Sequence, residues 1–279
     1  MNILPAWSEA FTPDRILPAP FVAHGGAGDR TWAYGDGRGT GVRVAVVDSG
    51  IDADHPAVGG VAGGVVVEPD RDAPGGARVI EGPHGDLFGH ATACAAIIRS
   101  LAPDVELYSV RVLGARLTGR AHVFARGLEW CIDNGMHVVN LSLSSTNDDW
   151  YAGFHDLCDL AARRNMVLVC ALNNERKASY PAEFSSVLSV AATAGTDPEV
   201  FQRNPSPPAE WGAPGIDVDV AWAGGGSITT TGNSFASPVI AAHAARILAT
   251  HPGIAPFQVK AVLAALAENA TDGSADRQR

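Results

Sequence analysis

Residues 42–48 read VRVAVVD, a short and almost wholly apolar run, rich in β-branched residues, that ends at Asp48. Such a run is typical of a strand that is covered on both faces. Similar runs recur at residues 105–113, 137–143, 166–172 and 186–192, and stretches with helical spacing lie between several of them, notably at residues 121–134 and 150–164. Strands that alternate with helices predict an α/β fold, in which a central, mostly parallel sheet is flanked by helices.

The chain of 279 residues can bury a large core, since 46% of its residues are hydrophobic and only 18% are charged. No Pro/Ser-rich linker or charge block divides it. We therefore predict one domain over residues 32–269, after an N-terminal arm or short leader at residues 1–31 and before a flexible tail at residues 270–279. A long helix is expected to begin near Ser234, and a further one to span residues 256–267.

The formal net charge of −10 disfavours nucleic acid and anionic membrane surfaces as partners, because both would repel the chain on average. The first residues, MNILPAWSEAFTPDR, lack the basic start and the apolar run of a signal peptide. No later run is apolar for long enough to cross a bilayer. We expect a cytoplasmic protein.

The four cysteines are widely spaced and form no CxxC pair, which argues against a zinc knuckle or a redox dithiol. We expect four free thiols, and two disulfides remain open if the chain is exported. These residues are Cys94, Cys131, Cys158 and Cys170.

Three segments each place one polar residue of a catalytic type among small residues. They are VAVVDSGIDADHP at residues 44–56, FGHATACAA at residues 88–96 and TTGNSFASP at residues 230–238. A serine hydroxyl is a poor nucleophile at neutral pH, so it needs an imidazole base within hydrogen-bond reach and a carboxylate that orients the imidazole. The three segments can supply this set through Asp48, His90 and Ser234.

The three segments resemble the Asp, His and Ser blocks of the subtilisin family, in the family's order, and the resemblance extends over residues 32–267. Residues 102–113 look like the strand that follows the family's histidine helix, and residues 138–143 look like its substrate-pairing strand. VLVCALNNE at residues 167–175 resembles the segment that ends in the oxyanion asparagine and a glutamate. The resemblance implies a three-layer subtilisin-like fold and a serine endopeptidase that works through an acyl-enzyme intermediate.

The resemblance assigns Asp48, His90 and Ser234 to a catalytic triad. It places the side-chain donor of the oxyanion hole at Asn174 and not at Asn173. An amide donor at such a position stabilises the transition state by about 3–4 kcal/mol. The backbone N–H of Ser234, at the start of its helix, is the expected second donor.

Peptide substrate is expected to bind along Ser142, Leu143, Ser144 and Asn173. Around this cleft the family commonly has glycines, which are replaced here at Ser144, Ser145, Asn173 and Ser179. The added side chains predict a smaller and more polar pocket, and hence restricted specificity. Glu175 at the rim either attracts a basic substrate residue or is a solvated surface charge.

The sequence also departs from the family beside the triad. Ala91 and Ala93 replace a glycine and a second histidine, and Asn233 replaces the threonine before the nucleophile. Because Asn233 could still donate a hydrogen bond toward the oxyanion, we expect only a modest change in rate. Cys94 falls where the thiol-containing branch of the family has a cysteine, or is simply a small buried residue. Pro238 is expected to fit the first turns of its helix.

No cofactor is expected. The family's strongest calcium site uses a loop inserted in the histidine helix, whereas residues 94–107 pass from helix to strand without room for it. We therefore predict that this calcium site is absent. Asp52, Asp54 and Asp70 cannot by themselves define a cation cage, which needs about six to eight oxygens.

The acidic balance and the short leader look like those of intracellular subtilisins, in which a proline-containing leader restrains activity. Residues 3–6, ILPA, either do likewise or form an arm packed on the surface. The leading prediction is an endopeptidase of restricted specificity that acts on peptide or protein substrates. One alternative is maturation of a ribosomal natural-product precursor, by cleavage or by acyl transfer to an amine as a transamidating cyclase. Another is a catalytically silent peptide-binding protein that keeps the groove.

Overall fold

The computed structural model describes residues 5–16, 19–20, 29–82 and 84–271. Its centre is a nine-stranded sheet with the order β4-β3-β5-β2-β6-β7-β8-β10-β9. Adjacent strands are parallel except at the two edges, where β4 and β9 run antiparallel to their neighbours. The predicted α/β class with a mostly parallel sheet is confirmed. The strands of this sheet are β2 (Arg43–Asp48), β3 (Gly63–Pro69), β4 (Ala77–Glu81), β5 (Glu106–Arg111), β6 (Val138–Leu141), β7 (Val167–Ala171), β8 (Leu188–Thr193), β9 (Gln202–Arg203) and β10 (Trp211–Pro214).

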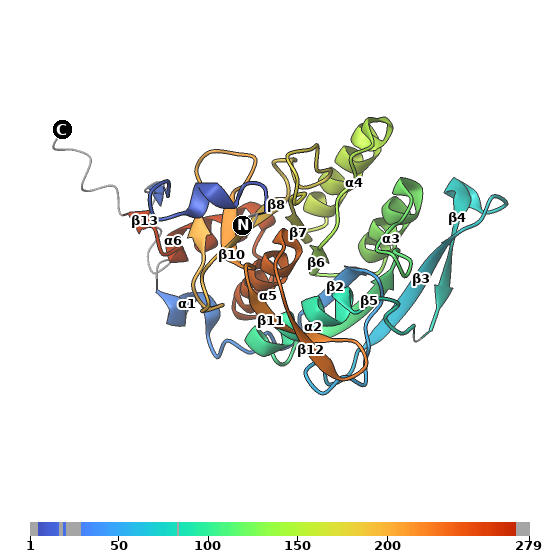
Figure 1. The fold of residues 1–279 in the computed structure, drawn as a ribbon, viewed down its shortest axis with the longest axis horizontal. Helices are drawn as coiled ribbons and strands as arrows, with labels where there is room; N and C mark the ends of the chain where they lie inside the picture. Colours follow the sequence, from blue (N-terminus) through green and yellow to red (C-terminus); the bar gives the residue numbers. More distant parts are fainter. Residues whose placement is uncertain (1–4, 17–18, 21–28, 83, 272–279) are drawn as a thin grey trace.

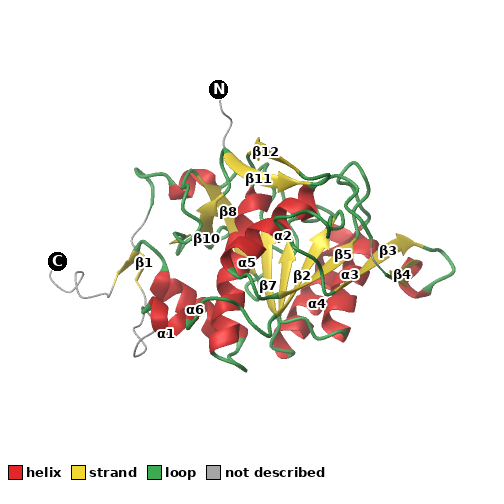
Figure 2. Ribbon diagram, turned by 90° about the horizontal axis from the view of Figure 1, so that it is seen from below, coloured by secondary structure: helices red, strands yellow, loops and turns green. Residues whose placement is uncertain are grey.

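Helices cover both faces of the sheet and complete the three layers (Figure 1). One face packs against α1, α2, α5 and α6, and the other packs against α3 and α4 (Figure 2). The helices are α1 (Arg30–Tyr34), α2 (His90–Leu101), α3 (Ala121–Asp133), α4 (Tyr151–Arg163), α5 (Asn233–Thr250) and α6 (Pro256–Leu266). None of the helices in the described part of the chain is long and apolar enough to cross a membrane.

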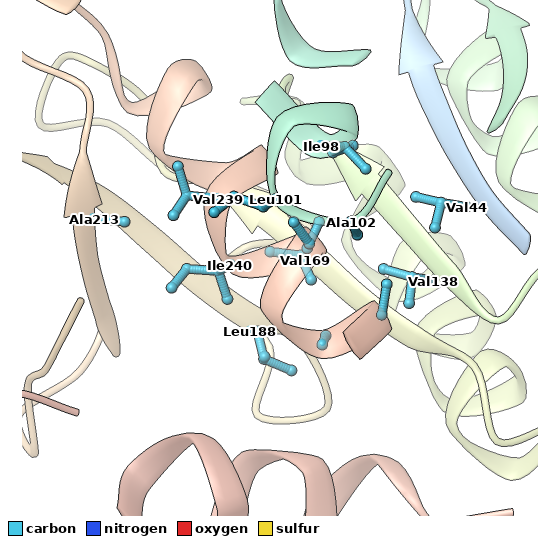
Figure 3. Close-up of a cluster of buried hydrophobic side chains, with 14 of the residues drawn as sticks. Val44, Ile98, Leu101, Ala102, Val138, Val169, Leu188, Ala213, Val239 and Ile240 are labelled. Atoms are coloured by element: carbon cyan, nitrogen blue, oxygen red, sulfur yellow. The ribbon is translucent and has the colours of Figure 1, made fainter. Parts of the chain in front are cut away.

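The unbroken apolar character of the central strands follows from this double cover. Along β2, Val44 and Val46 contribute to the core under α2 and α5, whereas Ala45 and Val47 contribute to the core under α3 and α4. Figure 3 shows the first of these cores, in which Val239 and Ile240 of α5 lie over the strands. Each fully buried aliphatic side chain of this size contributes about 1.5–3 kcal/mol.

The sequence analysis did not predict two of the hairpins in the structure. One consists of β3 and β4 at a sheet edge, and the other is a separate sheet of β11 (Val218–Trp222) and β12 (Gly226–Thr230). Four of the five residues of β12 are exposed, so this strand has no apolar run that would mark it. The hairpin β11–β12 packs against α2 and thereby borders the predicted site.

A segment of the N-terminal arm lies beside the last described residues, because β1 (Ala19–Pro20) pairs in parallel with β13 (Ala270–Thr271). The predicted flexible tail therefore begins with two paired residues, and its remainder, residues 272–279, lies outside the described residues. The predicted N-terminal arm includes a short 3-10 helix, Ser8–Phe11, and the first residues of α1.

Candidate active site

Two of the predicted triad residues are in direct contact. Asp48 is the last residue of β2 and is fully buried, and His90 is the first residue of α2. The Nδ1 atom of His90 lies 2.8 Å from Oδ2 of Asp48. A carboxylate in this position holds the imidazole in the tautomer that carries its proton on Nδ1, so Nε2 is the nitrogen that can accept a proton.

The third residue, Ser234, is the second residue of α5 and lines the same cleft as His90. This cleft has a volume of about 390 Å³. Gly232, just before α5, keeps the approach to the nucleophile clear, because a Cβ atom there would lie 3.2 Å from Oγ of Ser234. The fold thus brings His90 and Ser234, which are far apart in the sequence, to one cleft, and the buried Asp48 contacts His90 from behind.

The environment of His90 favours its protonated form. Burial by itself would lower the pKa of the imidazole, but the negative charge of Asp48 and the hydrogen bond to it outweigh burial. The more distant charge of Asp86 acts in the same direction, and the pKa is raised above the usual 6.5. His90 is therefore a stronger base than a free imidazole.

Asp86 is a residue that the sequence analysis missed. Its Oδ1 accepts hydrogen bonds from the backbone N–H groups of Phe88 and Gly89, at 2.9 and 2.8 Å, and from the hydroxyl of Ser49 at 2.8 Å. Its Oδ2 accepts from the backbone N–H and the hydroxyl of Thr92, at 2.9 and 2.7 Å. Asp86 thus satisfies donors at the start of α2 and fixes the first turn of the helix that carries His90. The signal available in the sequence was an aspartate four residues before His90.

The backbone carbonyl of Ser234 has an unusual set of partners. Pro238 lies four residues further along α5, in the second turn of the helix, and has no N–H to donate to this carbonyl. The hydroxyl of Ser142 donates instead, at 2.7 Å, and the thiol of Cys94 lies at 3.6 Å. Asn140 donates in turn to the Ser142 hydroxyl through Nδ2 at 2.9 Å. These bonds tie the nucleophile's backbone to β6 and α2.

The predicted oxyanion donor Asn174 is held by its own side chain. Its Oδ1 accepts a hydrogen bond from the backbone N–H of Asn233 at 2.9 Å. This contact fixes the amide plane and leaves the Nδ2 hydrogens of Asn174, which lines the cleft, as the donors for an oxyanion.

Asn233 has a different role from the one expected. The side chain is fully buried, and its Nδ2 donates to the carbonyl oxygens of Leu172 and Asn173 at 3.1 and 3.2 Å. Its Oδ1 accepts from the backbone N–H of Ala192 at 2.9 Å. The expectation that Asn233 could donate toward the oxyanion is therefore wrong, because its amide group is committed to the ends of β7 and β8.

All four residues expected to bind substrate line the cleft, namely Ser142, Leu143, Ser144 and Asn173. Two other replaced glycines do not line it. Ser145 forms an isolated antiparallel bridge with Tyr180 beyond the end of β6. Ser179 is buried, and its hydroxyl accepts from the backbone N–H of Asn173 at 2.8 Å. Apolar residues that the sequence analysis had not assigned to the site complete the lining: Leu113, Leu117, Ala171 and Leu172.

Within the described residues, one group of His, Cys, Asp and Glu side chains has the spacing of metal ligands. It consists of Asp48, His90 and Cys94, whose ligand atoms lie within 4.8 Å of one another. Since Asp48 and His90 are hydrogen-bonded to each other, we interpret these two as members of the predicted triad and Cys94 as a buried neighbour. The pKa of the Cys94 thiol is raised well above its usual value by burial and by the charge of Asp48, so this thiol stays protonated. All four cysteines are buried and unpaired.

The sequence and the fold of this chain are similar to those of known proteins. Residues 39–279 match the sequence model of the Subtilase family. The chain is 32% identical over 239 residues to a thermostable alkaline protease of Halalkalibacterium halodurans, an alignment that covers 80% of this chain and 61% of the relative. Over 235 residues it is 32% identical to Subtilisin Savinase of Lederbergia lenta, covering 80% of this chain and 81% of the relative. It is also 30% identical over 240 residues to Subtilisin E of Bacillus subtilis (strain 168), covering 80% of this chain and 59% of the relative.

Several of these relatives are longer than the matched region, and the chain spans about three fifths of the length of the first and the third. Among solved structures, a cold adapted subtilisin-like serine proteinase superposes with a TM-score of 0.62 at 24% identity, covering 80% of both chains. That superposition confirms the predicted fold.

Proposed function

Because this chain belongs to the subtilase family, we propose that it is a serine endopeptidase in which Asp48, His90 and Ser234 act as the catalytic triad. The observation that carries the proposal is the 2.8 Å contact between His90 and the buried Asp48 at the wall of a cleft that Ser234 also lines. A buried carboxylate that orients an imidazole beside a serine is the arrangement that activates a hydroxyl nucleophile.

In the first half of the proposed reaction, Oγ of Ser234 attacks the carbonyl carbon of the scissile peptide bond. The hydroxyl proton passes to Nε2 of His90, and the resulting imidazolium is stabilised by Asp48 through Nδ1. The negative charge on the former carbonyl oxygen is stabilised by Nδ2 of Asn174 and by the backbone N–H of Ser234 at the start of α5. The imidazolium then donates its proton to the departing amine, the C–N bond breaks, and an acyl-enzyme remains.

In the second half, water attacks the acyl carbon while His90 accepts a proton from it. The same oxyanion donors stabilise the second tetrahedral intermediate, and the protonated imidazole returns the proton to Oγ of Ser234 as the ester bond breaks. The products are a free carboxylate and a free amine, and the net reaction adds one water to the peptide bond.

We propose further that the substrate range is restricted. Ser144 and Asn173 place side chains in the cleft where smaller residues would leave more room. Glu175 also lines the cleft, but its carboxylate is engaged by Lys177, whose Nζ lies 2.5 Å away. The Lys177 ammonium lowers the pKa of Glu175, so this rim residue is ionised at neutral pH. A basic substrate residue would have to compete with Lys177 for it.

The expected absence of the family's strong calcium site remains a prediction. It is supported by the course of α2, which runs unbroken from His90 to Leu101 and is followed closely by β5. Chelation with EDTA should leave the unfolding temperature unchanged, and added calcium should not raise it. A rise of the unfolding temperature with calcium would show that the protein has a calcium site.

The test of the proposed activity is cleavage of a peptide library followed by mass spectrometry of the products. Hydrolysis adds one water per cleaved bond, whereas cyclisation or transfer to another amine adds none. The native chain should give hydrolysed fragments from a narrow set of sequences, and Ser234→Ala should give none. Well-folded native protein that binds peptides without cleaving any would support the silent binder instead.

A further inference from the structure

An N-terminal segment, residues 5–11, lies against the loop that carries the predicted oxyanion donor. The backbone N–H of Ala6 donates to the carbonyl oxygen of Asn174 at 2.7 Å. In return, Nδ2 of Asn233, the residue before Ser234, donates to the carbonyl oxygen of Ala6 at 3.2 Å. We call residues 5–11 the N-terminal brace. Its backbone is hydrogen-bonded both to the oxyanion residue and to the residue next to the nucleophile.

Side chains of the brace extend the contact to Arg176, two residues after Asn174. The guanidinium of Arg176 forms an ion pair with Glu9 and lies over the indole ring of Trp7, with 4.7 Å between Cζ and the ring centroid. An exposed ion pair alone contributes little. Together with the cation–π contact and the Ala6 hydrogen bond, it fixes several points of one short loop.

The brace itself is anchored to the body of the fold. Phe11 is buried against Gly212 of β10, where a Cβ atom would lie only 2.4 Å from the phenyl ring, so no larger residue fits at that position. Trp7 adopts the left-handed conformation with φ of 77°, which costs about 1 kcal/mol or more for a residue other than glycine. This turn lets the chain contact Asn174 through Ala6 and then enter the short helix that ends at Phe11.

The loop has few other means of support. Residues 174–177 are all exposed, so no core packing holds them in place. The oxyanion amide must nevertheless stay in position, because a displacement of about 1 Å can cost on the order of a hundredfold in rate. The carbonyl oxygen of Asn174 accepts from Ala6 of the brace, and its Oδ1 accepts from the backbone N–H of Asn233. Because Asn233 is itself hydrogen-bonded to Ala6, both contacts that hold Asn174 involve the brace or a residue bound to it.

We propose that the N-terminal brace is a positioning element of the active site, which holds Asn174 in the geometry that stabilises the oxyanion. The inference rests on the proposed endopeptidase function. The proposed effect is opposite to that of a leader that restrains activity: loss of the brace would slow catalysis, whereas loss of an inhibitory leader would speed it. Of the leader residues considered in the sequence, Ile3 and Leu4 lie outside the described residues, and Pro5 and Ala6 belong to the brace.

The test uses the full chain with Ala6→Pro, which removes the N–H donor to Asn174, and a second variant that lacks residues 1–11. Asp14→Asn, which changes an exposed carboxylate three residues after the brace, is the matched control. We expect kcat on a peptide substrate to fall about ten- to a hundredfold in both brace variants with KM nearly unchanged, and to stay constant in the control. The affinity for a peptide aldehyde, whose adduct with serine places an oxygen in the oxyanion hole, should fall by a similar factor.

A double-mutant cycle separates this role from a general structural one. In an Asn174→Ala background the brace variants should cause little further loss of kcat, because the residue through which they act is gone. An equal loss in that background, an unchanged kcat, or a gain of activity on deletion would each overturn the proposal. Hydrogen exchange adds a readout that needs no activity, since residues 173–177 should exchange faster in Ala6→Pro. If the native chain cleaves nothing while this exchange still rises, the endopeptidase proposal fails and the brace contact stands.

Discussion

The hydroxyl of Ser142 lies 2.7 Å from the backbone carbonyl oxygen of Ser234, in the place of the helical N–H that Pro238 lacks. A residue expected to bind substrate thus also completes the hydrogen bonding of the nucleophile's own backbone. Because the site is buried from solvent on this side, water cannot replace the missing donor without cost.

Ser142→Ala should therefore destabilise the fold. Removal of the donor leaves a buried carbonyl with only the distant thiol of Cys94, and the expected loss is about 1–3 kcal/mol in the free energy of unfolding. Urea denaturation measures it. Ser144→Ala, two residues further along the same cleft wall, is the control and should change stability by less than about 0.5 kcal/mol. Equal stability of the two variants would contradict the assigned role of Ser142.

The activity should depend on pH through His90. Catalysis needs the neutral imidazole, and the pKa of His90 is raised by Asp48. The acidic limb of the pH profile, in which kcat/KM rises with pH, should therefore have its midpoint above pH 6.5. In Asp48→Asn the charge that raises the pKa is lost, so the limb should move to lower pH. At the plateau, kcat should fall by a factor on the order of 10⁴, as in other triads that lose the carboxylate. A limb that stays in place in Asp48→Asn would show that another group titrates.

Asp86→Asn should weaken the start of α2. The carboxylate accepts five hydrogen bonds around the first turn of the helix, so we expect a loss of about 1–2 kcal/mol in stability. Because the charge of Asp86 helps to raise the pKa of His90, the pH limb of activity should also move slightly downward. Asp36→Asn is a matched control, since Asp36 likewise accepts from the N–H two residues on but is exposed and remote from the cleft. Thermal unfolding of both variants measures the loss of stability, and a pH profile of kcat/KM measures the shift of the limb.

Asn174→Ala should lower kcat by about 10²–10³ with little change in KM, because the lost donor acts on charge that develops only in the transition state. The adjacent Asn173→Ala removes a side chain that lines the cleft and accepts from the N–H of Glu175 at 2.9 Å. It should act mainly on KM and on substrate preference. A larger loss of kcat in Asn173→Ala than in Asn174→Ala would show that Asn173, and not Asn174, is the oxyanion donor.

Much of the fold could be predicted because the deciding strands are covered on both faces. A run such as residues 44–47, apolar at four consecutive positions, is typical of a strand with helices on both sides, so the sequence of the strand indicates its environment. The hairpin β11–β12 and the brace carry no such pattern. Their positions depend on contacts between residues distant in the sequence, such as Phe11 against Gly212 and β11 against α2.

The same distinction holds for the site. Asp48, His90 and Ser234 stand in local motifs that could be recognised one at a time, and the fold brings His90 and Ser234 to one cleft with the buried Asp48 behind His90. The partners of Asn233 are Leu172, Asn173 and Ala192, which no local motif links to it, so its role could not be foreseen. Asp86 escaped notice because a capping residue lies in irregular chain before the helix that it serves.

Whether Ser234 is an activated nucleophile can be measured by the intact mass of the protein after incubation with a fluorophosphonate. We expect a gain of one adduct on the native chain, located at Ser234, and no gain on Ser234→Ala. His90→Ala should label far more slowly, since the serine would lose its base. Absence of labelling in well-folded native protein, or labelling that persists in Ser234→Ala, would contradict the assignment of Ser234 as the activated nucleophile.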